Sequence, residues 1–261
     1  MSPAVLGGRP FGFIARNALE PRNYRALAAM PQRFPRPLDA AQRYLLARGT
    51  YPHDQAVRTP SGTVRARLHS PHDFITLVEA FCREDYRATA GDRVVVDIGS
   101  NVGLSALYFL TRGPLVRCRL YEPVPRNVER LRHNLRAYED RYRLEPVAVA
   151  DRAGELSFGV EATGRYGGLD RELPDRITVT CRHIDAVLEE VLADEDRVDV
   201  LKIDTEGAEP ATLEAIRPDL LARVGRIYLE LEDREPALPP GWRRRVACQT
   251  LRLDNPLQGR A

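Results

Sequence analysis

The sequence predicts an α/β protein whose core is a doubly wound, mainly parallel β-sheet. The run Val94–Ile98 is apolar except for one acid, without alternation, which suits a parallel strand buried on both faces. Predicted strands and helices then alternate as far as residue 231, and repeated strand–helix units of this length build such a sheet. Ligands bind these sheets at the carboxyl ends of the strands. Acidic residues stand at that end of five predicted strands: Asp97, Glu122, Asp151, Asp204 and Glu230.

The composition is that of an ordinary globular protein. The chain has 261 residues, of which 43% are hydrophobic and 29% charged, enough for one substantial α/β domain and an appendage. The net charge is +2, and the charges are scattered rather than gathered in one basic block. A nucleic-acid partner is therefore not expected.

Cysteine spacing and hydropathy indicate the cellular compartment in which the protein is expected. The four cysteines lie far apart and form no Cys-x-x-Cys pair, which argues against a disulfide framework or a zinc site. Residues 1–19 lack the apolar core and cleavage pattern of a signal peptide, and no apolar run approaches the ~20 residues that cross a bilayer. We therefore expect a cytoplasmic protein with reduced thiols and no membrane partner.

The chain ahead of the core has two parts, which together form an N-terminal α/β extension. Residues 1–55 are rich in Pro, Arg and Ala, and their pattern allows one short helix over 38–47. They are compatible with a lid, a partly ordered arm or an oligomer contact, such as that of a homodimer. Residues 56–92 predict a β-hairpin followed by a helix over 74–86, with Asp73 as its N-cap.

The core itself is expected over residues 93–261. The predicted strands cover 94–98, 115–121, 142–150, 198–203 and 224–231, and the predicted helices cover 104–110, 125–136, 184–192 and 209–216. Two alternating stretches, 155–160 and 177–181, predict a hairpin or an extension of the sheet. Only 30 residues follow Leu231, and four prolines interrupt them. We therefore expect a short C-terminus with one edge strand over 249–253 in place of a further helix and a complete hairpin.

The pattern Asp97-x-Gly99-x-Asn101-x-Gly103 ends the first core strand and begins a helix. Glycines at such a turn let the backbone approach a ligand, and the helix N-terminus offers unpaired N–H groups. Dinucleotide-binding proteins carry Gly-x-Gly-x-x-Gly here, and an acid inside that loop would repel the pyrophosphate. An acid at the strand end instead suits a cationic ligand, such as the amino and sulfonium groups of S-adenosylmethionine. The alternative is a glycine-bearing turn with Asp as a helix cap and no ligand.

Glu122 and Asp151 follow the next two strands. Glu122 lies 19 residues after Gly103, close to the offset at which an acid hydrogen-bonds ribose hydroxyls in nucleoside-binding α/β folds. Alternatively, its charge favours the dipole of the next helix. Asp151 is placed to contact an adenine amino group, or it is a turn residue before Gly154.

A second motif, Asp204-Thr-Glu206-Gly-Ala-Glu209, follows the fourth strand. Three acids within six residues can bind a metal, act as a general base or cap a helix, and capping is the ordinary role for Glu209. Lys202, the only lysine of this arginine-rich chain, precedes the motif. Its presence indicates a position that a guanidinium does not fit, and we expect its ammonium to pair with a nearby acid.

Five blocks in order resemble the FkbM-type family of S-adenosylmethionine-dependent methyltransferases. They are Val-Asp-Ile-Gly-Ser-Asn-Val-Gly (96–103), Tyr-Glu-Pro (121–123), Val-Ala-Val-Ala-Asp (147–151), Ile-Asp-Ala-Val-Leu (184–188) and Leu-Lys-Ile-Asp-Thr-Glu-Gly-Ala-Glu (201–209). The resemblance covers about residues 56–231 and leaves out both ends of the chain. It implies a class I methyltransferase, Rossmann-like fold and O-methylation of a hydroxyl on a sugar, glycan or polyketide-type natural product.

The resemblance also implies a set of residues that hold the cofactor, S-adenosylmethionine. Four motif residues would surround its methionine part, Glu122 its ribose and Asp151 its adenine. The complete predicted set is Asp97, Gly99, Ser100, Asn101, Gly103, Glu122, Pro123, Asp151 and Asp204.

Methyl transfer to an alcohol benefits from a base, because an alcohol is a poor nucleophile at neutral pH. Asp204 is the first candidate, followed by Glu206 and Glu230. His183 is less favoured, since a lone histidine at a strand end is more often structural. No metal is expected, because no second set of oxygen ligands accompanies the acids.

Other functions are also compatible with the sequence. A catalytically silent cofactor-binding partner subunit is favoured by the short C-terminus. A methyltransferase with a nitrogen or nucleic-acid acceptor is disfavoured by the weak basic footprint, and hydride transfer by the missing pyrophosphate loop. The expected partner is a small-molecule or glycan acceptor.

Overall fold

The computed structural model describes residues 5–6, 9–10, 21–160, 167–169, 175–205, 207–230, 234–247 and 250–257. The chain divides into two compact units, Met1–Ala88 and Thr89–Ala261. No helix in the described part of the chain combines the length and apolarity needed to cross a bilayer.

The first unit holds short helices and a β-hairpin. Its elements are β1 (Val5–Leu6), β2 (Arg9–Pro10), α2 (Pro21–Arg33), α3 (Pro37–Leu46), β3 (His53–Thr59), β4 (Gly62–Leu68), α4 (Pro71–Val78) and the π-helical η1 (Glu79–Arg83). The predicted hairpin is confirmed as the antiparallel pair β3–β4. Helix α2 was not predicted: Pro21 takes its first position, and Pro31 lies in its last turn.

The N-cap of α4 differs from the prediction. Ser70, and not Asp73, is the N-cap, and its Oγ accepts a hydrogen bond from the Asp73 amide at 3.2 Å. The Asp73 carboxylate in turn accepts hydrogen bonds from the backbone N–H of His69 and from Ser70 Oγ, at 2.6 and 2.7 Å. The two side chains therefore form a reciprocal capping arrangement that begins the helix three residues earlier than its apolar periodicity suggests.

The second unit is built on a seven-stranded sheet with the order β14-β15-β13-β12-β5-β6-β7. Neighbouring strands from β13 to β7 are parallel, and β15 runs antiparallel to both β13 and β14. The strands are β5 (Val94–Ile98), β6 (Arg117–Tyr121), β7 (Tyr142–Glu145), β12 (Val198–Ile203), β13 (Val224–Glu230), β14 (Arg243–Ala247) and β15 (Thr250–Asp254). The predicted doubly wound, mainly parallel sheet is confirmed.

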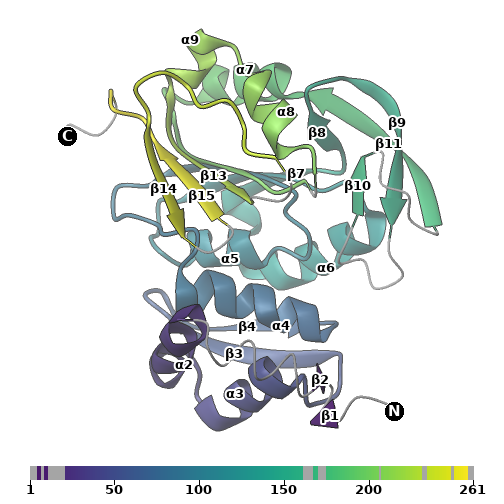
Figure 1. Ribbon diagram of the computed structural model, residues 1–261, viewed down its shortest axis with the longest axis vertical. Helices are drawn as coiled ribbons and strands as arrows, with labels where there is room; N and C mark the ends of the chain where they lie inside the picture. The colour runs from purple at the N-terminus through teal and green to yellow at the C-terminus, as the bar shows by residue number, and fades with distance from the viewer. Residues whose placement is uncertain are drawn as a thin grey trace. The chain divides into compact units, whose positions relative to one another are not determined.

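Helices cover both faces of this sheet, which explains its apolar central strands. In Figure 1, α5 (Leu104–Leu110) and α6 (Pro125–Leu135) lie on one face, and α7 (Ile184–Asp194), α8 (Glu209–Glu214) and α9 (Pro218–Leu221) lie on the other. The 3-10 helix η2 (Arg136–Arg141) follows α6. All residues of β5 and β12 are buried, as expected for parallel strands covered on both sides.

A second sheet of four strands branches from this core. It has the order β10-β9-β11-β8 and comprises β8 (Ala148–Ala150), β9 (Gly154–Val160), β10 (Gly167–Leu169) and β11 (Asp175–His183). The single strand predicted over 142–150 is wrong: Pro146 lies between β7 and β8, which belong to different sheets. Proline lacks the N–H that a continuing ladder requires. The predicted extension from the two alternating stretches is confirmed as the β9–β11 pair.

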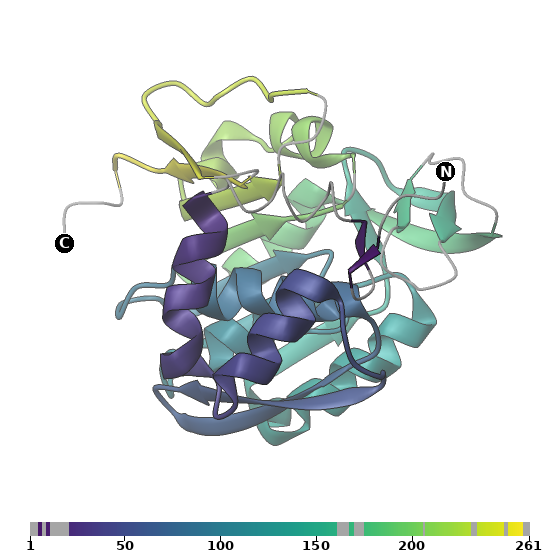
Figure 2. The same cartoon turned by 60° about the horizontal axis from the view of Figure 1, so that its bottom comes forward.

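The expectation of an incomplete C-terminal hairpin is also wrong. β14 and β15 form a full antiparallel pair that extends the central sheet, and only two residues separate them. Both strands of the hairpin are therefore added to the sheet, and the described residues 234–242 that precede them contain no helix. Figure 2 shows this hairpin and the four-stranded sheet on opposite sides of the second unit.

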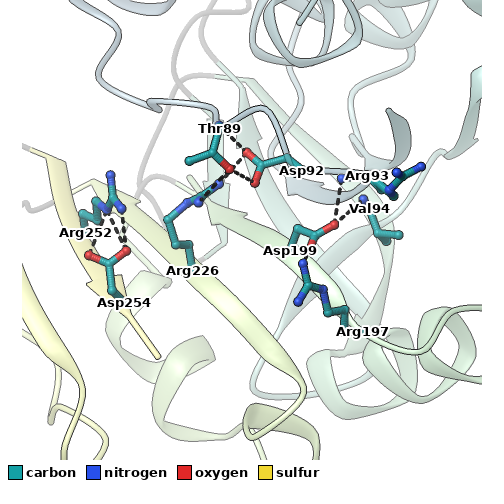
Figure 3. A network of polar contacts seen from close by, with 9 residues as sticks. All are labelled: Thr89, Asp92, Arg93, Val94, Arg197, Asp199, Arg226, Arg252 and Asp254. Carbon is teal, nitrogen blue, oxygen red and sulfur yellow. Dashed lines mark hydrogen bonds and ion pairs between the residues drawn. The ribbon is translucent and has the colours of Figure 1, made fainter. Parts of the chain in front are cut away.

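The amino ends of three central strands are tied together by acids and arginines (Figure 3). Asp199 Oδ2 accepts hydrogen bonds from the backbone N–H groups of Arg93 and Val94, at 2.7 and 3.0 Å. Asp92 forms an ion pair with Arg226 at 2.5 Å. These contacts fix the starts of β5, β12 and β13, at the edge opposite to the predicted site.

Candidate active site

The turn after β5 adopts a left-handed backbone at three motif positions. The φ angles are +74° at Gly99, +48° at Asn101 and +83° at Gly103. A Cβ placed on Gly99 would lie 1.7 Å from the backbone oxygen of Asp204, so that only glycine allows the turn to pass the end of β12. The first glycine therefore brings the two sequence motifs together.

Asp97 lies behind this turn and is fully buried. Strand alternation directs it to the face covered by α5, where its Oδ2 accepts a hydrogen bond from Ser105 Oγ at 2.6 Å. Its Oδ1 accepts a hydrogen bond from Lys202 Nζ at 3.0 Å. The Ser100 hydroxyl is buried as well and donates to the backbone oxygen of Asp97 at 2.7 Å. Both oxygens of the Asp97 carboxylate are thus held by neighbouring elements.

Lys202 confirms the expectation that the only lysine pairs with nearby acids. It stands opposite Asp97 in the parallel register of β12 and β5, and it is buried. Its Nζ also lies 3.1 Å from Asp204 Oδ2 and donates to the backbone oxygen of Gly99 at 3.2 Å. Burial alone would lower the pKa of Lys202, but the carboxylates of Asp204 and Asp97 outweigh it and raise the pKa above its ordinary value. The ammonium is therefore charged at neutral pH.

Glu122 stands at the carboxyl end of β6 and is 4% exposed. Its oxygens accept hydrogen bonds from the backbone N–H groups of Asn101 and Val124, at 2.9 and 3.0 Å, and from Asn127 Nδ2 at 3.3 Å. Burial raises its pKa to about 7 in spite of these donors and the more distant charge of Lys202. The carboxylate has acceptor capacity left, since four lone-pair sites are available and three donors are bound.

Of the two acids of the second motif that the structure describes, Asp204 is the more accessible. Its side chain is 24% exposed, and its backbone N–H donates to the oxygen of Ile98 at 3.1 Å. Glu209 is buried and accepts hydrogen bonds from the backbone N–H groups of Thr205 and Gly207, at 2.7 and 2.8 Å. Ala208 is the N-cap of α8 and no side-chain hydrogen bond from the described residues caps this helix, so that the expected capping role of Glu209 is wrong; its carboxylate holds the loop before the helix instead. Glu206 lies outside the described residues.

The remaining predicted residues are more dispersed. Asp151 follows β8 in the small sheet and forms an ion pair with Arg152 at 3.5 Å. The Nδ1 of His183 accepts a hydrogen bond from the backbone N–H of Asp185 at 3.1 Å and caps α7, which is the structural role expected for a lone histidine. Glu230 ends β13, which lies beside β12 on the side away from β5.

Pro123 and its neighbour Val124 join Glu122 to the small sheet. Pro123 is half-buried and follows Glu122 directly. Val124 packs in one apolar cluster with residues of β8, β9 and β11, among them Ala150 and Phe158. The small sheet therefore supports the loop whose Val124 N–H donates to the Glu122 carboxylate.

Ser105 and Asn127 are site residues that the sequence reasoning missed. Both lie in the first turn of the helix that follows a strand-end acid, eight residues after Asp97 and five after Glu122. A hydroxyl or amide in such a turn points back toward the strand end, and this spacing could have identified them. Among the described residues, no group of three or more His, Cys, Asp or Glu side chains is arranged to hold a metal ion.

The sequence matches a family model described as a methyltransferase FkbM domain, over residues 97–246. The match extends over 150 of 261 residues, more than half of the chain. The match places the chain in the class of methyltransferase domains. In particular, the chain belongs to the FkbM methyltransferase family, as the five sequence blocks implied.

Three curated relatives show the range of this similarity. The AMB antimetabolite synthetase AmbE of Pseudomonas aeruginosa is 28% identical over 228 residues, covering 71% of this chain and 11% of AmbE. The 2-O-methyltransferase NoeI of Sinorhizobium fredii is 30% identical over 162 residues, covering 55% of this chain and 65% of NoeI. The 31-O-demethyl-FK506 methyltransferase FkbM of Streptomyces tacrolimicus is 26% identical over 222 residues, covering 70% of this chain and 84% of FkbM. The chain spans about a tenth of AmbE and just under two thirds of NoeI.

The residues at the carboxyl end of the sheet fit the cofactor that the family implies. S-adenosylmethionine presents ribose hydroxyls as hydrogen-bond donors and two cationic groups. Glu122 offers a carboxylate with unused acceptor capacity and a raised pKa, which hydroxyl donors would stabilise in its ionised form. Asp97 and Asp204 share one ammonium between them, so that the cluster favours additional positive charge.

Proposed function

We propose that this protein transfers a methyl group from S-adenosylmethionine to a hydroxyl oxygen of a small molecule, either a sugar or glycan or a polyketide-type natural product. The observation that carries the proposal is the acid cluster at the ends of β5, β6 and β12. There one carboxylate, that of Asp204, is both partly exposed and held in place. The names of the relatives NoeI and FkbM, which are O-methyltransferases, support an oxygen acceptor.

Glu122 would hold the cofactor ribose, and the Gly99–Gly103 turn its methionine part. Asp97 is fully buried with both oxygens bonded. We therefore assign it a supporting position behind the turn, from which its charge favours a cationic ligand. Asp151 stays a predicted contact of the adenine, and Pro123 a predicted contact of the cofactor.

Asp204 would act as the general base. S-adenosylmethionine supplies an electrophilic methyl group when it is bound. Asp204 Oδ2 pairs with Lys202, and Oδ1 has no hydrogen-bond partner within the residues that the structure describes. A carboxylate oxygen within reach of the acceptor hydroxyl orients it and takes its proton, a contribution of roughly 10²–10⁴-fold in rate. Glu206 and Glu230 stay secondary candidates.

The observation that favoured a silent partner subunit does not hold. That alternative depended on a C-terminus too short for a full sheet, and both β14 and β15 are present. Catalysis is therefore the better-supported reading, with a small-molecule or glycan acceptor as partner.

Calorimetric titration with S-adenosylmethionine tests the cofactor part of the proposal. We expect micromolar binding by the wild type and weaker binding by Glu122→Ala, because the ribose then loses its acceptor. Arg197→Ala, at the amino end of the sheet, is the matched control and should bind as the wild type does. A folded wild type that binds neither S-adenosylmethionine nor S-adenosylhomocysteine would overturn the cofactor assignment.

Mass spectrometry tests the acceptor part. The enzyme is incubated with S-adenosylmethionine and a panel of hydroxylated sugars, glycans and macrolides, and products heavier by one methyl group are sought. Methylation at oxygen supports the proposal. Methylation only at nitrogen, or only of RNA included in the panel, contradicts it.

A further inference from the structure

Lys202 joins the two motifs of the active site through a single nitrogen atom. Its Nζ contacts Asp97 Oδ1 at 3.0 Å, Asp204 Oδ2 at 3.1 Å and the backbone oxygen of Gly99 at 3.2 Å. These three oxygens come from the end of β5, from the turn after it and from the residue that follows β12. One ammonium therefore fixes three parts of the site relative to one another.

The three partners of Lys202 differ in their access to a ligand. Asp97 is fully buried and tied to Ser105 on its far side. Asp204 is 24% exposed and is bound to Lys202 through only one of its two carboxylate oxygens. The geometry thus holds one oxygen of a carboxylate whose side chain is partly exposed.

We propose that Lys202 is a positioning residue for methyl transfer, which orients the Asp204 carboxylate toward the acceptor hydroxyl. This rests on the proposed function, in which Asp204 is the base. A displacement of about 1 Å in a reacting group can cost on the order of 10²-fold in rate, so that a fixed carboxylate has a direct kinetic value.

The three contacts also explain why the position holds lysine in a chain otherwise rich in arginine. An ammonium directs three donors from one compact atom, whereas a guanidinium is planar and carries its donors in a wider fork. Because the Nζ site is buried and the Gly99 turn passes close to Asp204, a guanidinium would displace one of the three oxygens.

The competing explanation is that Lys202 only neutralises Asp97. Lys202→Met would leave two uncompensated acids and destabilise the fold. The informative protein is therefore the double variant Lys202→Met/Asp97→Asn, compared with Asp97→Asn alone. If Lys202 positions Asp204, the double variant folds and binds S-adenosylhomocysteine within about fivefold of the wild type, but its kcat is at least tenfold below that of Asp97→Asn. A kcat within threefold of Asp97→Asn overturns the proposal.

A matched control comes from the other end of the sheet. Asp92 and Arg226 also form a largely buried ion pair between the region before β5 and β13. Arg226→Met/Asp92→Asn should match the wild type in kcat, although its stability falls. A comparable loss of kcat in this control would show that removal of any ion pair of the sheet slows the reaction, and the proposal would fail.

A readout independent of catalysis uses the fact that the chain has one lysine. Protein labelled with 15N only at lysine Nζ should give one ammonium signal at pH 7, because a buried, triply bonded ammonium exchanges its protons slowly. Asp204→Asn should shift that signal or remove it. A missing wild-type signal, or one that Asp204→Asn leaves unchanged, overturns the pairing even if the double variant fails to fold. A wild type that shows the expected signal but transfers no methyl group contradicts the proposed function instead.

Discussion

The two ends of the central sheet differ in how the charge of their buried acids is compensated. At the amino end, Asp92 has its own arginine, Arg226, and it accepts hydrogen bonds from the backbone N–H and Oγ1 of Thr89 at 2.8 and 2.6 Å (Figure 3). At the carboxyl end, Asp97 and Asp204 share Lys202, and the donors that the described residues give to Glu122 are all neutral. One end is balanced by itself, and the other has an excess of negative charge.

This difference indicates that the acids at the amino end serve stability and that those at the carboxyl end serve function. A buried acid with its own cation and N–H donors fixes strands and has no need of a ligand. Burial raises the pKa of Glu122 to about 7, so that its ionised form is destabilised. A ligand that donates hydrogen bonds to this carboxylate can offset that destabilisation. The imbalance at the carboxyl end is what we expect of a site that is completed by a cationic, hydroxyl-bearing cofactor.

The largest effect should come from Asp204→Asn. An amide cannot take the proton of the acceptor hydroxyl, so that kcat should fall roughly 10²–10⁴-fold while cofactor affinity stays within a few-fold. Steady-state kinetics with the acceptor found by mass spectrometry would measure this. If kcat falls less than threefold, Asp204 is not the base, and Glu206 and Glu230 would be tested next.

The second prediction concerns the close approach of the two motifs. Gly99→Ala places a Cβ against the backbone of Asp204 at a left-handed φ of +74°, and we expect a loss of roughly 3 kcal/mol or more in unfolding free energy. Gly241 is a matched control, since its φ is +80° and a Cβ there would meet only Pro256, at 3.9 Å. Gly241→Ala should lose about 1–2 kcal/mol, the backbone cost alone. Equal losses in denaturant unfolding would mean that the approach to Asp204 is relaxed easily.

The third prediction is a pH dependence of stability. The pKa of Glu122 rises from an ordinary 4.5 to about 7 on folding because of burial. The folded state binds the proton more tightly, so that this stabilising contribution is complete below pH 4.5 and is lost as the pH rises through 7. Its size is about 3 kcal/mol, from a shift of roughly 2.5 units.

Thermal or denaturant unfolding at pH 5 and pH 8 would measure this contribution. Burial also raises the pKa values of Glu209 and Asp85, so that the difference between wild type and Glu122→Gln isolates Glu122. The variant should lose less stability than the wild type between the two pH values, by roughly 2–3 kcal/mol. Parallel pH profiles would show that Glu122 is already compensated and that the two ends of the sheet are alike.

The parallel part of the sheet could be predicted because local sequence determines it. Strands buried on both faces are continuous apolar runs, and the turns between them carry glycine and acids. The errors arose where a partner distant in the sequence decides the structure. Pro146 sends β8 into another sheet, and β14 is stabilised by pairing with β15 although its residues are all exposed.

The site could be predicted in kind but not in its contacts. Strand ends and motif spacing indicated which acids gather at one edge. The pairing of Lys202 with Asp97 depends on the register of two strands 105 residues apart, which no local pattern encodes. The exposure of the acids could not be predicted either. The motif indicates Asp97 as a ligand contact, yet its carboxylate is fully buried.

The smallest expected effect concerns two equivalent hydrogen bonds, one at each end of the sheet. Ser105 Oγ donates to Asp97 Oδ2 and Thr89 Oγ1 donates to Asp92 Oδ1, both at 2.6 Å. Ser105→Ala should cost about 2 kcal/mol in unfolding free energy, because a buried, charged acceptor loses a donor that water cannot replace. Thr89→Val should cost less than about 1 kcal/mol, since the Asp92 carboxylate keeps the backbone N–H of Thr89 and the Arg226 guanidinium as partners.

Denaturant unfolding of the two variants therefore measures how strongly each end depends on its own hydrogen bonds. If S-adenosylhomocysteine binds Ser105→Ala less tightly but binds Thr89→Val as it binds the wild type, the carboxyl end couples its internal hydrogen bonds to ligand. If both variants lose the same stability and neither changes ligand affinity, the acids at the carboxyl end are as self-contained as those at the amino end. The charge imbalance would then be no sign of a site, because an end that needs a ligand must respond to it when its support is weakened.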